Sequence, residues 1–228
     1  KRSSHVMDWS KKNVLVTGGN GFLGSKVVKL LTQLGVQNIS IPNSITDDLR
    51  NKDNCSRCTE KIDIVFHLAA KVGGIGLNQE KPGELFYDNL MMGTNVMEES
   101  RKNKVKKLIA LGTICSYPKF TPVPFSENAI WDGYPEETNA PYGLAKKMLL
   151  VQSMAYRQQY DFESIVVFPT NLYGPGDNFK EGSSHAIPAI IKKVFEAKRN
   201  NQKSIRLWGD GSATRDFLYV DDAAQGII

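Results

Sequence analysis

Much of the fold follows from one stretch near the start of the chain, "NVLVTGGNGFLG", Asn13 to Gly24. An apolar run of strand length leads into glycines at three-residue intervals, Gly18, Gly21 and Gly24, and the helical pattern "GSKVVKLLTQLG" begins at the last of them. Gly18 permits a tight turn, Gly21 lets the backbone approach a pyrophosphate, and Gly24 allows close packing of helix on strand. The helix N-terminus would stabilise the phosphate charge. This order of strand, glycine turn and helix predicts a dinucleotide-binding site rather than a purely structural turn.

Beyond this stretch, apolar runs of strand length continue to alternate with helical patterns. Continuous Val, Ile and Leu runs joined by helices indicate a parallel sheet that is covered on both faces. Right-handed crossovers then make it a Rossmann-type, doubly wound α/β fold. We expect further strands within 38–41, 62–70, 106–112 and 163–169, and long helices over 83–103 and 141–160.

Three parts are expected along the chain. Residues 1–12 look like a polar leader or remnant, and 13–174 form the NAD(P)-binding Rossmann domain. After Pro175 the sequence becomes glycine-rich and polar, which is typical of a smaller substrate-binding domain. Within 175–228 we expect a helix over 186–198 and strand-like pieces at 204–211 and 215–222, and late elements can return to the sheet. A new helix is expected to begin after Ala224, and this second region is therefore expected to be truncated.

The composition excludes several classes of protein. With 41% apolar and 23% charged residues, the chain is an ordinary globular sequence. No window approaches the ~18 apolar residues that span a bilayer, and no signal-peptide pattern is present, so no membrane association is expected. The net charge of +5 is not gathered into a basic patch, which argues against a nucleic-acid partner. The three cysteines lack disulfide spacing, and this favours a reducing, cytoplasmic location.

Two of the cysteines form the motif "CSRC", Cys55 to Cys58. This spacing occurs in zinc and redox sites, but the sequence offers no second pair of ligands to complete a tetrahedral site. The motif also lacks the strand-to-helix position of a thioredoxin-like site. We therefore expect no metal, and we place both cysteines on a surface helix.

The residues after the second strand bear on the choice between NAD and NADP. A carboxylate at the strand end would bind the ribose 2′-hydroxyl and repel a 2′-phosphate. The sequence has Pro42, Asn43 and Ser44 there, and Asp47 and Asp48 follow only later. The missing early carboxylate favours NADP, although no arginine is present to support that preference.

A second group of polar residues carries the predicted chemistry. In "PYGLAKK", Tyr142 and Lys146 are four residues apart and project from one face of a helix. The Lys146 ammonium would lower the tyrosine pKa and hold a ribose hydroxyl, while the phenol exchanges a proton with a carbonyl oxygen. Thr113 follows the fourth strand and could bond the same oxygen. Cys115, two residues on, is either a packing residue or a reagent, and the nearby Tyr117 is not expected to be catalytic.

Taken together, these motifs resemble the extended short-chain dehydrogenase/reductase family over nearly all of 13–228. The segments "HLAAKVGGI", "LGTICSYPK", "PTNLYGPGDNF", "SSHAIPAIIKK" and "LWGDGSATRDFLYVDD" are similar to those of its GDP-L-fucose synthases. Enzymes of that group convert GDP-4-keto-6-deoxymannose by 3,5-epimerisation and 4-reduction. The resemblance therefore implies an NADPH-dependent enzyme that makes GDP-L-fucose or a close GDP-deoxysugar.

The resemblance also implies roles for individual residues. Tyr142 is then the proton donor at C4, assisted by Lys146 and by Thr113, which stands where serine is usual. Cys115 would be the epimerisation base and His185 the acid. Without the resemblance, both would be read as ordinary packing or polar residues, and the implied substrate-binding residues as core or surface positions. These substrate-binding residues are Lys193, Trp208 and Arg215.

The cofactor-binding residues implied by the resemblance lie in loops that follow successive strands. They comprise Gly18, Gly19, Asn20, Gly21, Phe22, Leu23, Gly24, Asp48, Leu49, Leu68, Ala69, Ala70, Leu111, Gly112, Thr113, Ile114, Lys146, Pro169, Thr170, Asn171, Leu172 and His185.

The sequence leaves two alternatives to the full epimerase and reductase function, and the resemblance implies a dimer. The chain could be a GDP-sugar reductase or epimerase with half of this chemistry, or a truncated, non-catalytic nucleotide-binding protein. Retention of both Cys115 and His185 argues against a reductase alone. By the resemblance, the helices that carry Asn89 and Tyr142 pair across a homodimer as a four-helix bundle. Asn89 itself is read as solvent-facing or backbone-bonded, with contact to an active-site water as the alternative.

Overall fold

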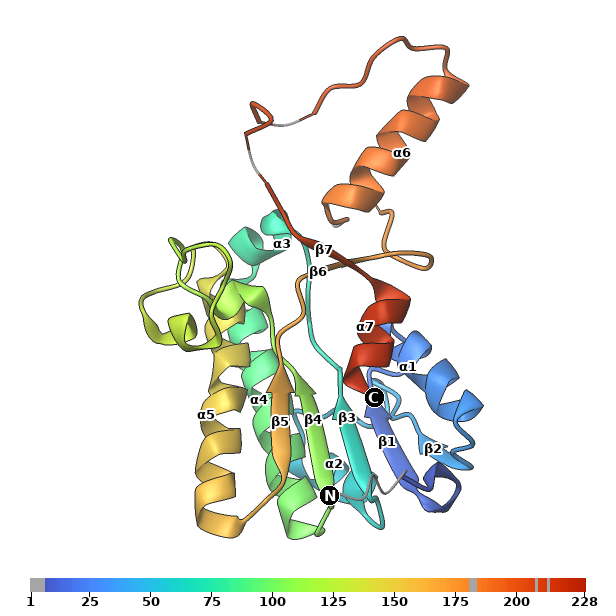
Figure 1. Ribbon diagram of the computed structural model, residues 1–228, viewed down its shortest axis with the longest axis vertical. Helices are drawn as coiled ribbons and strands as arrows, with labels where there is room; N and C mark the ends of the chain where they lie inside the picture. Colours follow the sequence, from blue (N-terminus) through green and yellow to red (C-terminus); the bar gives the residue numbers. More distant parts are fainter. Residues whose placement is uncertain (1–6, 181–183, 208, 213) are drawn as a thin grey trace, which may run out of the picture.

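The computed structural model describes residues 7–180, 184–207, 209–212 and 214–228. Its centre is a five-stranded parallel sheet with strand order β2-β1-β3-β4-β5 (Figure 1). The four predicted strands beside β1 all form, so the sequence prediction of the sheet is confirmed. The strands are β1 (Asn13–Thr17), β2 (Asn38–Ser40), β3 (Ile64–His67), β4 (Lys107–Leu111) and β5 (Ser164–Val167).

Helices cover both faces of the sheet because its strands bury side chains on both sides. Val14 and Val16 of β1 pack toward one face with α1 and α7, whereas Leu15 packs toward the other with α2, α4 and α5. This arrangement is the doubly wound fold that the continuous apolar runs predicted. The helices are α1 (Phe22–Gln33), α2 (Lys52–Thr59), α4 (Pro82–Lys102), α5 (Ala140–Tyr160) and α7 (Val220–Ile227).

The remaining elements lie beyond the carboxyl ends of the strands or in the loops. A short parallel pair, β6 and β7, leads away from the sheet, and α6 stands clear of it at the far end of the molecule (Figure 1). From β7 the chain returns through α7, which packs against α1. These elements are η1 (Trp9–Lys11), α3 (Ile75–Glu80), η2 (Ile114–Ser116), η3 (Glu127–Trp131), β6 (Asn171–Tyr173), α6 (Ala186–Arg199) and β7 (Phe217–Tyr219).

Three local predictions were wrong. The expected strand at 204–211 is irregular in its described residues, since no neighbouring strand pairs with it there. The last helix begins at Val220 rather than after Ala224, because its apolar face packs onto α1. Cys55 is not at the surface: it is fully buried in the core beneath α4, and its thiol donates to the Leu49 carbonyl oxygen at 3.1 Å.

The strand order also locates the functional edge of the sheet. The chain passes from β1 to β2 on one side and then crosses to β3 on the other, so the direction of winding reverses between β1 and β3. In open parallel sheets, ligands bind outside the carboxyl ends of the strands at such a reversal. The Gly18–Gly24 turn follows β1, and Leu68 to Ala70 of the "HLAA" segment follow β3.

Candidate active site

The glycine turn after β1 has a shape that only glycine allows. Gly18 has a φ of +71°, and a Cβ there would lie 2.8 Å from the Ala69 nitrogen. A Cβ on Gly24 would lie 2.0 Å from the Gly18 carbonyl oxygen, so the missing side chain lets α1 approach the turn. Both positions match the conformational reasons given for these glycines.

The N-terminus of α1 offers donors for an anionic group. Gly21 is the capping residue, no side chain caps the helix, and the first turn contains no acidic residue. The first N–H groups of a helix lack partners within it, and the helix dipole favours negative charge there. A pyrophosphate would therefore fit this turn, with Asn20, Phe22 and Leu23 beside it in the chain. Gly19 also belongs to the turn, since a Cβ there would lie 2.9 Å from the Ile41 side chain.

A buried polar pair joins this turn to the loop after β3. The Thr17 hydroxyl lies 2.8 Å from Nδ1 of His67 and accepts a hydrogen bond from the Ala69 backbone at 3.2 Å. Burial lowers the pKa of His67 to about 3, so its imidazole is neutral at physiological pH. Leu68 is buried and Ala70 half-buried in the same loop. The prediction did not assign this pair; a threonine ending β1 opposite a histidine ending β3 was the available signal.

The end of this loop is held by α4. Asn89 is buried and bonds both backbone groups of Lys71, accepting from its nitrogen at 3.0 Å and donating to its oxygen at 2.9 Å. Of the alternatives for Asn89, the structure has the backbone-bonded one. The Lys71 ammonium in turn pairs with Asp88 at 2.9 Å.

Asp88 also connects the loop after β2. Its carboxylate accepts from Arg50 at 2.9 Å, and Arg50 holds Asp48 through a contact of 2.6 Å. Hydrogen bonds from Arg50 lower the pKa of Asp48. Leu49 between them is buried. One carboxylate on α4 thus ties together the loops after β2 and β3, a connection that the sequence did not reveal.

The predicted catalytic residues Thr113, Cys115 and Tyr142 meet where β4 and α5 come together. Thr113 begins the short helix η2, and its hydroxyl accepts from the Cys115 backbone at 3.2 Å. The Thr113 and Cys115 side chains also lie close enough to the Tyr142 phenol to influence its pKa. Lys146 lies one turn further along α5 and is only 1% exposed.

Gly143 explains why this approach is possible. A Cβ on Gly143 would lie 2.1 Å from the Cys115 carbonyl oxygen, so only glycine lets α5 approach η2 this closely. The Ser116 hydroxyl donates to the Gly143 carbonyl oxygen at 2.8 Å and fixes the contact. Neither residue was predicted, although the glycine directly after Tyr142 was visible in "PYGLAKK".

Burial dominates the acid–base properties of this cluster. Burial, and after it the neighbouring Cys115, raise the pKa of Tyr142, while the Thr113 hydrogen bond acts in the opposite direction. Burial also raises the pKa of Cys115 and lowers that of Lys146 to about 8. In this structure the pKa of Tyr142 lies above its ordinary value, because burial of the phenol outweighs the effect of Thr113, and the lowering of this pKa by Lys146 stays a prediction.

The other predicted cofactor residues line the adjacent strand ends. Leu111 ends β4, and the Gly112 nitrogen donates to the Val167 carbonyl oxygen at 2.7 Å; Ile114 follows in η2. After β5, Pro169 is half-buried, and Thr170 and Asn171 donate to the Asp216 carbonyl oxygen at 2.8 and 2.9 Å. Leu172 pairs with Leu218 in the small sheet.

The predicted substrate residues and the predicted acid lie elsewhere. His185 is exposed at the start of α6, and Arg215 donates to the Thr214 carbonyl oxygen in the segment before β7. Lys193 donates to the Arg206 carbonyl oxygen at 2.9 Å. Within the described residues, no hydrogen bond joins His185 or Arg215 to the four-residue cluster around Tyr142. Trp208 lies outside the described residues.

Among the described residues, His, Cys, Asp and Glu side chains do not gather in threes as a metal site would require. The helices described there are also too short or too polar to cross a membrane.

The geometry of a dinucleotide fold with a Tyr–Lys pair agrees with comparisons to known proteins. Residues 14–228 match the NAD dependent epimerase/dehydratase family, and the chain belongs to that family. Within it, the chain is 38% identical to GDP-L-fucose synthase 1 of Arabidopsis thaliana, over 99% of this chain and 70% of that one. It is 37% identical to GDP-L-fucose synthase of Escherichia coli (strain K12), over 96% and 69%.

A solved structure gives the same result in three dimensions. A GDP-L-fucose synthetase from Naegleria fowleri, bound to NADP, matches with a TM-score of 0.85 at 30% identity. The match covers 97% of this chain and 72% of that one. The resemblance to extended short-chain dehydrogenases and to GDP-L-fucose synthases is therefore confirmed, and the chain spans about 70% of the length of these relatives.

Proposed function

We propose that this chain carries out NADPH-dependent 3,5-epimerisation and 4-keto reduction of GDP-4-keto-6-deoxy-D-mannose or a closely related GDP-sugar. The observation that carries the proposal is the convergence of Thr113, Cys115 and Tyr142 at the contact between η2 and α5, with Lys146 buried one turn away. A plain reductase needs the two hydroxyls and the lysine, whereas the thiol has a use only if C–H bonds are also broken.

The residues present fit a bound dinucleotide. The Gly18 and Gly24 positions form a cradle that a Cβ would fill, and the uncapped α1 N-terminus faces the place of the pyrophosphate. NADP is favoured over NAD because no carboxylate follows β2 directly and Asp48 is engaged by Arg50. The NADP-bound relative supports the same choice. When bound, NADPH supplies the hydride for C4.

The epimerisation would use the acidity that a ketone gives to its neighbours. The C4 carbonyl acidifies the C–H bonds at C3 and C5, because each carbanion is delocalised as an enolate. Cys115, as thiolate, takes these protons, and Tyr142 and Thr113 stabilise the enolate oxygen by hydrogen bonds. His185 returns a proton to carbon on the opposite face, and solvent restores both groups. This role requires α6 to bring His185 to the sugar.

Reduction would follow at the same carbonyl. As hydride reaches C4, the Tyr142 hydroxyl transfers its proton to the oxygen, and the C4 ketone becomes an alcohol while the cofactor is oxidised. Thr113 holds the same oxygen during this step. Lys146 holds the cofactor ribose and supplies positive charge as the phenolate forms. One carbonyl thus serves both reactions.

An assay with the purified chain tests this proposal. NADPH absorbance is followed with GDP-4-keto-6-deoxymannose, and we expect it to fall only when the sugar is present. A folded chain that binds NADPH but oxidises none of it would overturn the enzyme reading and support a non-catalytic nucleotide-binding protein. Mass analysis in deuterated water separates the half-reactions: a reductase alone would introduce no deuterium at C3 or C5.

The proposal also covers the roles of the two parts of the chain, its location and its assembly. Residues 13–174 serve as the dinucleotide-binding part and 175–228 as part of the substrate-binding region, in a cytoplasmic enzyme. A homodimer through α4 and α5 is supported by apolar side chains exposed on these two adjacent helices. They are Phe86, Tyr87, Met148, Val151 and Met154. Sedimentation of the chain should show twice the monomer mass.

A further inference from the structure

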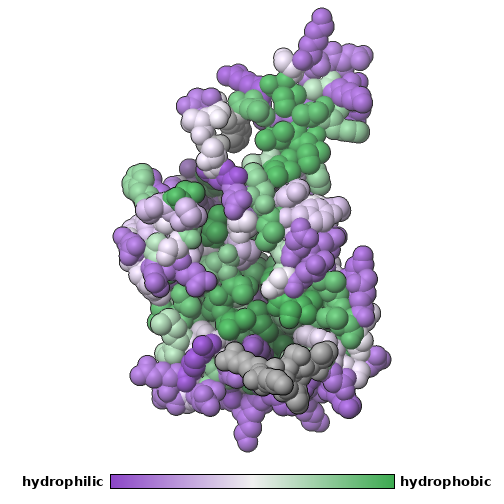
Figure 2. All heavy atoms as spheres, in the orientation of Figure 1, coloured by the Kyte–Doolittle hydropathy of each residue, from purple (hydrophilic) through white to green (hydrophobic). Residues whose placement is uncertain are grey.

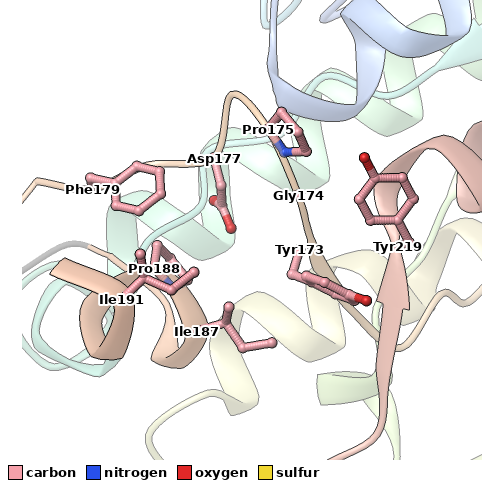
Figure 3. Close-up of a pocket in the computed structure, with 9 residues that line it drawn as sticks. All are labelled: Tyr173, Gly174, Pro175, Asp177, Phe179, Ile187, Pro188, Ile191 and Tyr219. Atoms are coloured by element: carbon pink, nitrogen blue, oxygen red, sulfur yellow. The ribbon is translucent and has the colours of Figure 1, made fainter. Parts of the chain in front are cut away.

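A cavity lies between the small β6–β7 sheet and the start of α6, and its lining contains none of the Tyr142 cluster (Figure 3). Its volume is about 340 Å³, which suits a ring system rather than an ion. Its walls are mostly apolar and partly aromatic, and the residues come from β6, β7, the segment after β6, and α6. The apolar and aromatic wall residues include Tyr173, Tyr219, Phe179, Ile187, Pro188 and Ile191.

Among the described residues that line this apolar space, Asp177 carries the one charged group. Asp177 follows β6, and its carboxylate points toward the space between Ile187 and Tyr173 (Figure 3). Its Oδ1 accepts from the Asn178 backbone at 2.7 Å. Its Oδ2 is buried and accepts no hydrogen bond within the part of the chain that the structure describes. A buried carboxylate oxygen without a donor is costly, so this position calls for a ligand that brings donors.

The chemistry of the cavity narrows the class of ligand. A phosphate would be repelled by Asp177, and a wholly apolar group would leave its Oδ2 unsatisfied. A flat ring with two neighbouring N–H donors on one edge would pack against the apolar walls and donate hydrogen bonds to the carboxylate. Guanine has such an edge, with N1–H beside the exocyclic N2 amine. Adenine has an acceptor at N1, and uracil has a single N–H between two carbonyl acceptors.

We infer that this cavity binds the guanine base of the nucleotide-sugar and that Asp177 recognises its N1–H and N2–H edge. The inference rests on the proposed function, because a GDP-sugar substrate supplies the base. Tyr173, Tyr219 and Phe179 provide aromatic surfaces for the ring, and Ile187 and Pro188 close the cavity from α6. The chain then distinguishes guanine nucleotides from other nucleotides by one carboxylate.

The test compares GDP with IDP, which lacks only the N2 amine, as ligands of the full chain by calorimetry. Wild type should bind GDP at least about tenfold more tightly than IDP, the range for a hydrogen bond to a charged group. Asp177→Asn keeps the acceptor for the Asn178 backbone but loses the charge. We expect it to bind GDP about 10 to 100 times more weakly and to bring GDP and IDP within about threefold of each other.

Three controls make the outcome decisive. NADPH affinity should be unchanged in Asp177→Asn, and its melting temperature without ligand should be unchanged or higher, because a buried charge without a donor is removed. The exposed Asp210, whose side chain accepts hydrogen bonds from the nearby Ser212, provides the matched variant Asp210→Asn, which should keep wild-type GDP affinity. A wild-type GDP-to-IDP ratio in Asp177→Asn, or a lower melting temperature with equal losses for both ligands, would overturn the inference. A wild-type chain that binds NADPH but not GDP would instead overturn the proposed substrate class.

Discussion

The two regions with predicted catalytic residues, the Tyr142 cluster and the region around α6, differ in how their side chains are held in position. Around Tyr142, the side chains come from elements packed against the sheet, and backbone contacts such as Ser116 to Gly143 fix their separation. Around α6, the predicted residues lie on a helix that stands away from the sheet and leaves Ile191, Val194 and Phe195 exposed; apolar atoms gather over this part of the molecule in Figure 2. Among the described residues, the contacts that build the Tyr142 cluster are therefore present, whereas no hydrogen bond joins His185 to it.

The largest expected effect is the loss of ketone reduction when the Tyr142 hydroxyl is removed. Tyr142→Phe keeps the ring packing but removes the proton donor, so NADPH oxidation with the 4-keto sugar should fall by about 10³-fold. NADPH affinity, measured by cofactor fluorescence, should stay within about twofold. The matched control is Tyr117→Phe, which alters the buried neighbouring tyrosine and should leave turnover near wild type. Equal losses in both variants would mean that the cluster does not act through Tyr142.

The thiol separates the two half-reactions within the same cluster. Cys115→Ser should reduce deuterium uptake at C3 and C5 by more than about 10²-fold, because a serine hydroxyl is a far weaker acid and is rarely ionised. Direct reduction of the unepimerised ketone should survive, and product analysis by mass and stereochemistry would show it. Deuterium uptake at the wild-type rate would exclude Cys115 as the base.

The pH dependence of the two half-reactions should run in opposite directions. Burial raises the pKa of Cys115, so the thiolate fraction, and with it deuterium uptake, should increase with pH by up to tenfold per unit. Burial lowers the pKa of Lys146 to about 8, so its charge is lost as pH rises through that value and reduction should decline. Separate pH profiles of exchange and single-turnover NADPH oxidation check this. If both pH profiles ran in the same direction, the assignment of Cys115 to exchange and of Lys146 to reduction would be contradicted.

A smaller effect should follow from a change in the backbone contact itself. Gly143→Ala places a Cβ against the Cys115 carbonyl and must push η2 away from α5. We expect both half-reactions to fall by about 10- to 100-fold and the melting temperature to drop by several degrees. Gly83→Ala, in α4 where a Cβ meets nothing within 4 Å, should leave activity unchanged and raise stability slightly. Loss of only one half-reaction in Gly143→Ala would show that the contact does not position the cluster as a unit.

Periodicity and motif spacing predicted the sheet, its helices and the set of Thr113, Tyr142 and Lys146, because these depend on local patterns; Cys115 was added by the family resemblance. What they could not predict were contacts between segments far apart in the chain. Cys55 looked like a surface residue in a polar helix, yet α4 covers it. Ser116 and Gly143 carry no catalytic group, but they set the distance between two that do. Asp177 was part of a recognised motif, and only the fold shows its carboxylate against an apolar cavity.

The smallest expected effect concerns Asp88, which links the loops after β2 and β3 without lying in the Tyr142 cluster. Burial raises its pKa, but hydrogen bonds from Lys71 and Arg50 outweigh this and keep its pKa below the ordinary value, so it is charged at neutral pH. Asp88→Asn should loosen both loops and raise the KM for NADPH by about tenfold, with kcat changed by less than about twofold. Glu84→Gln is the matched control, because Glu84 pairs with the same Lys71 at 2.8 Å but is half exposed. A fall in kcat at unchanged KM would mean that Asp88 affects the chemistry rather than the hold on the cofactor.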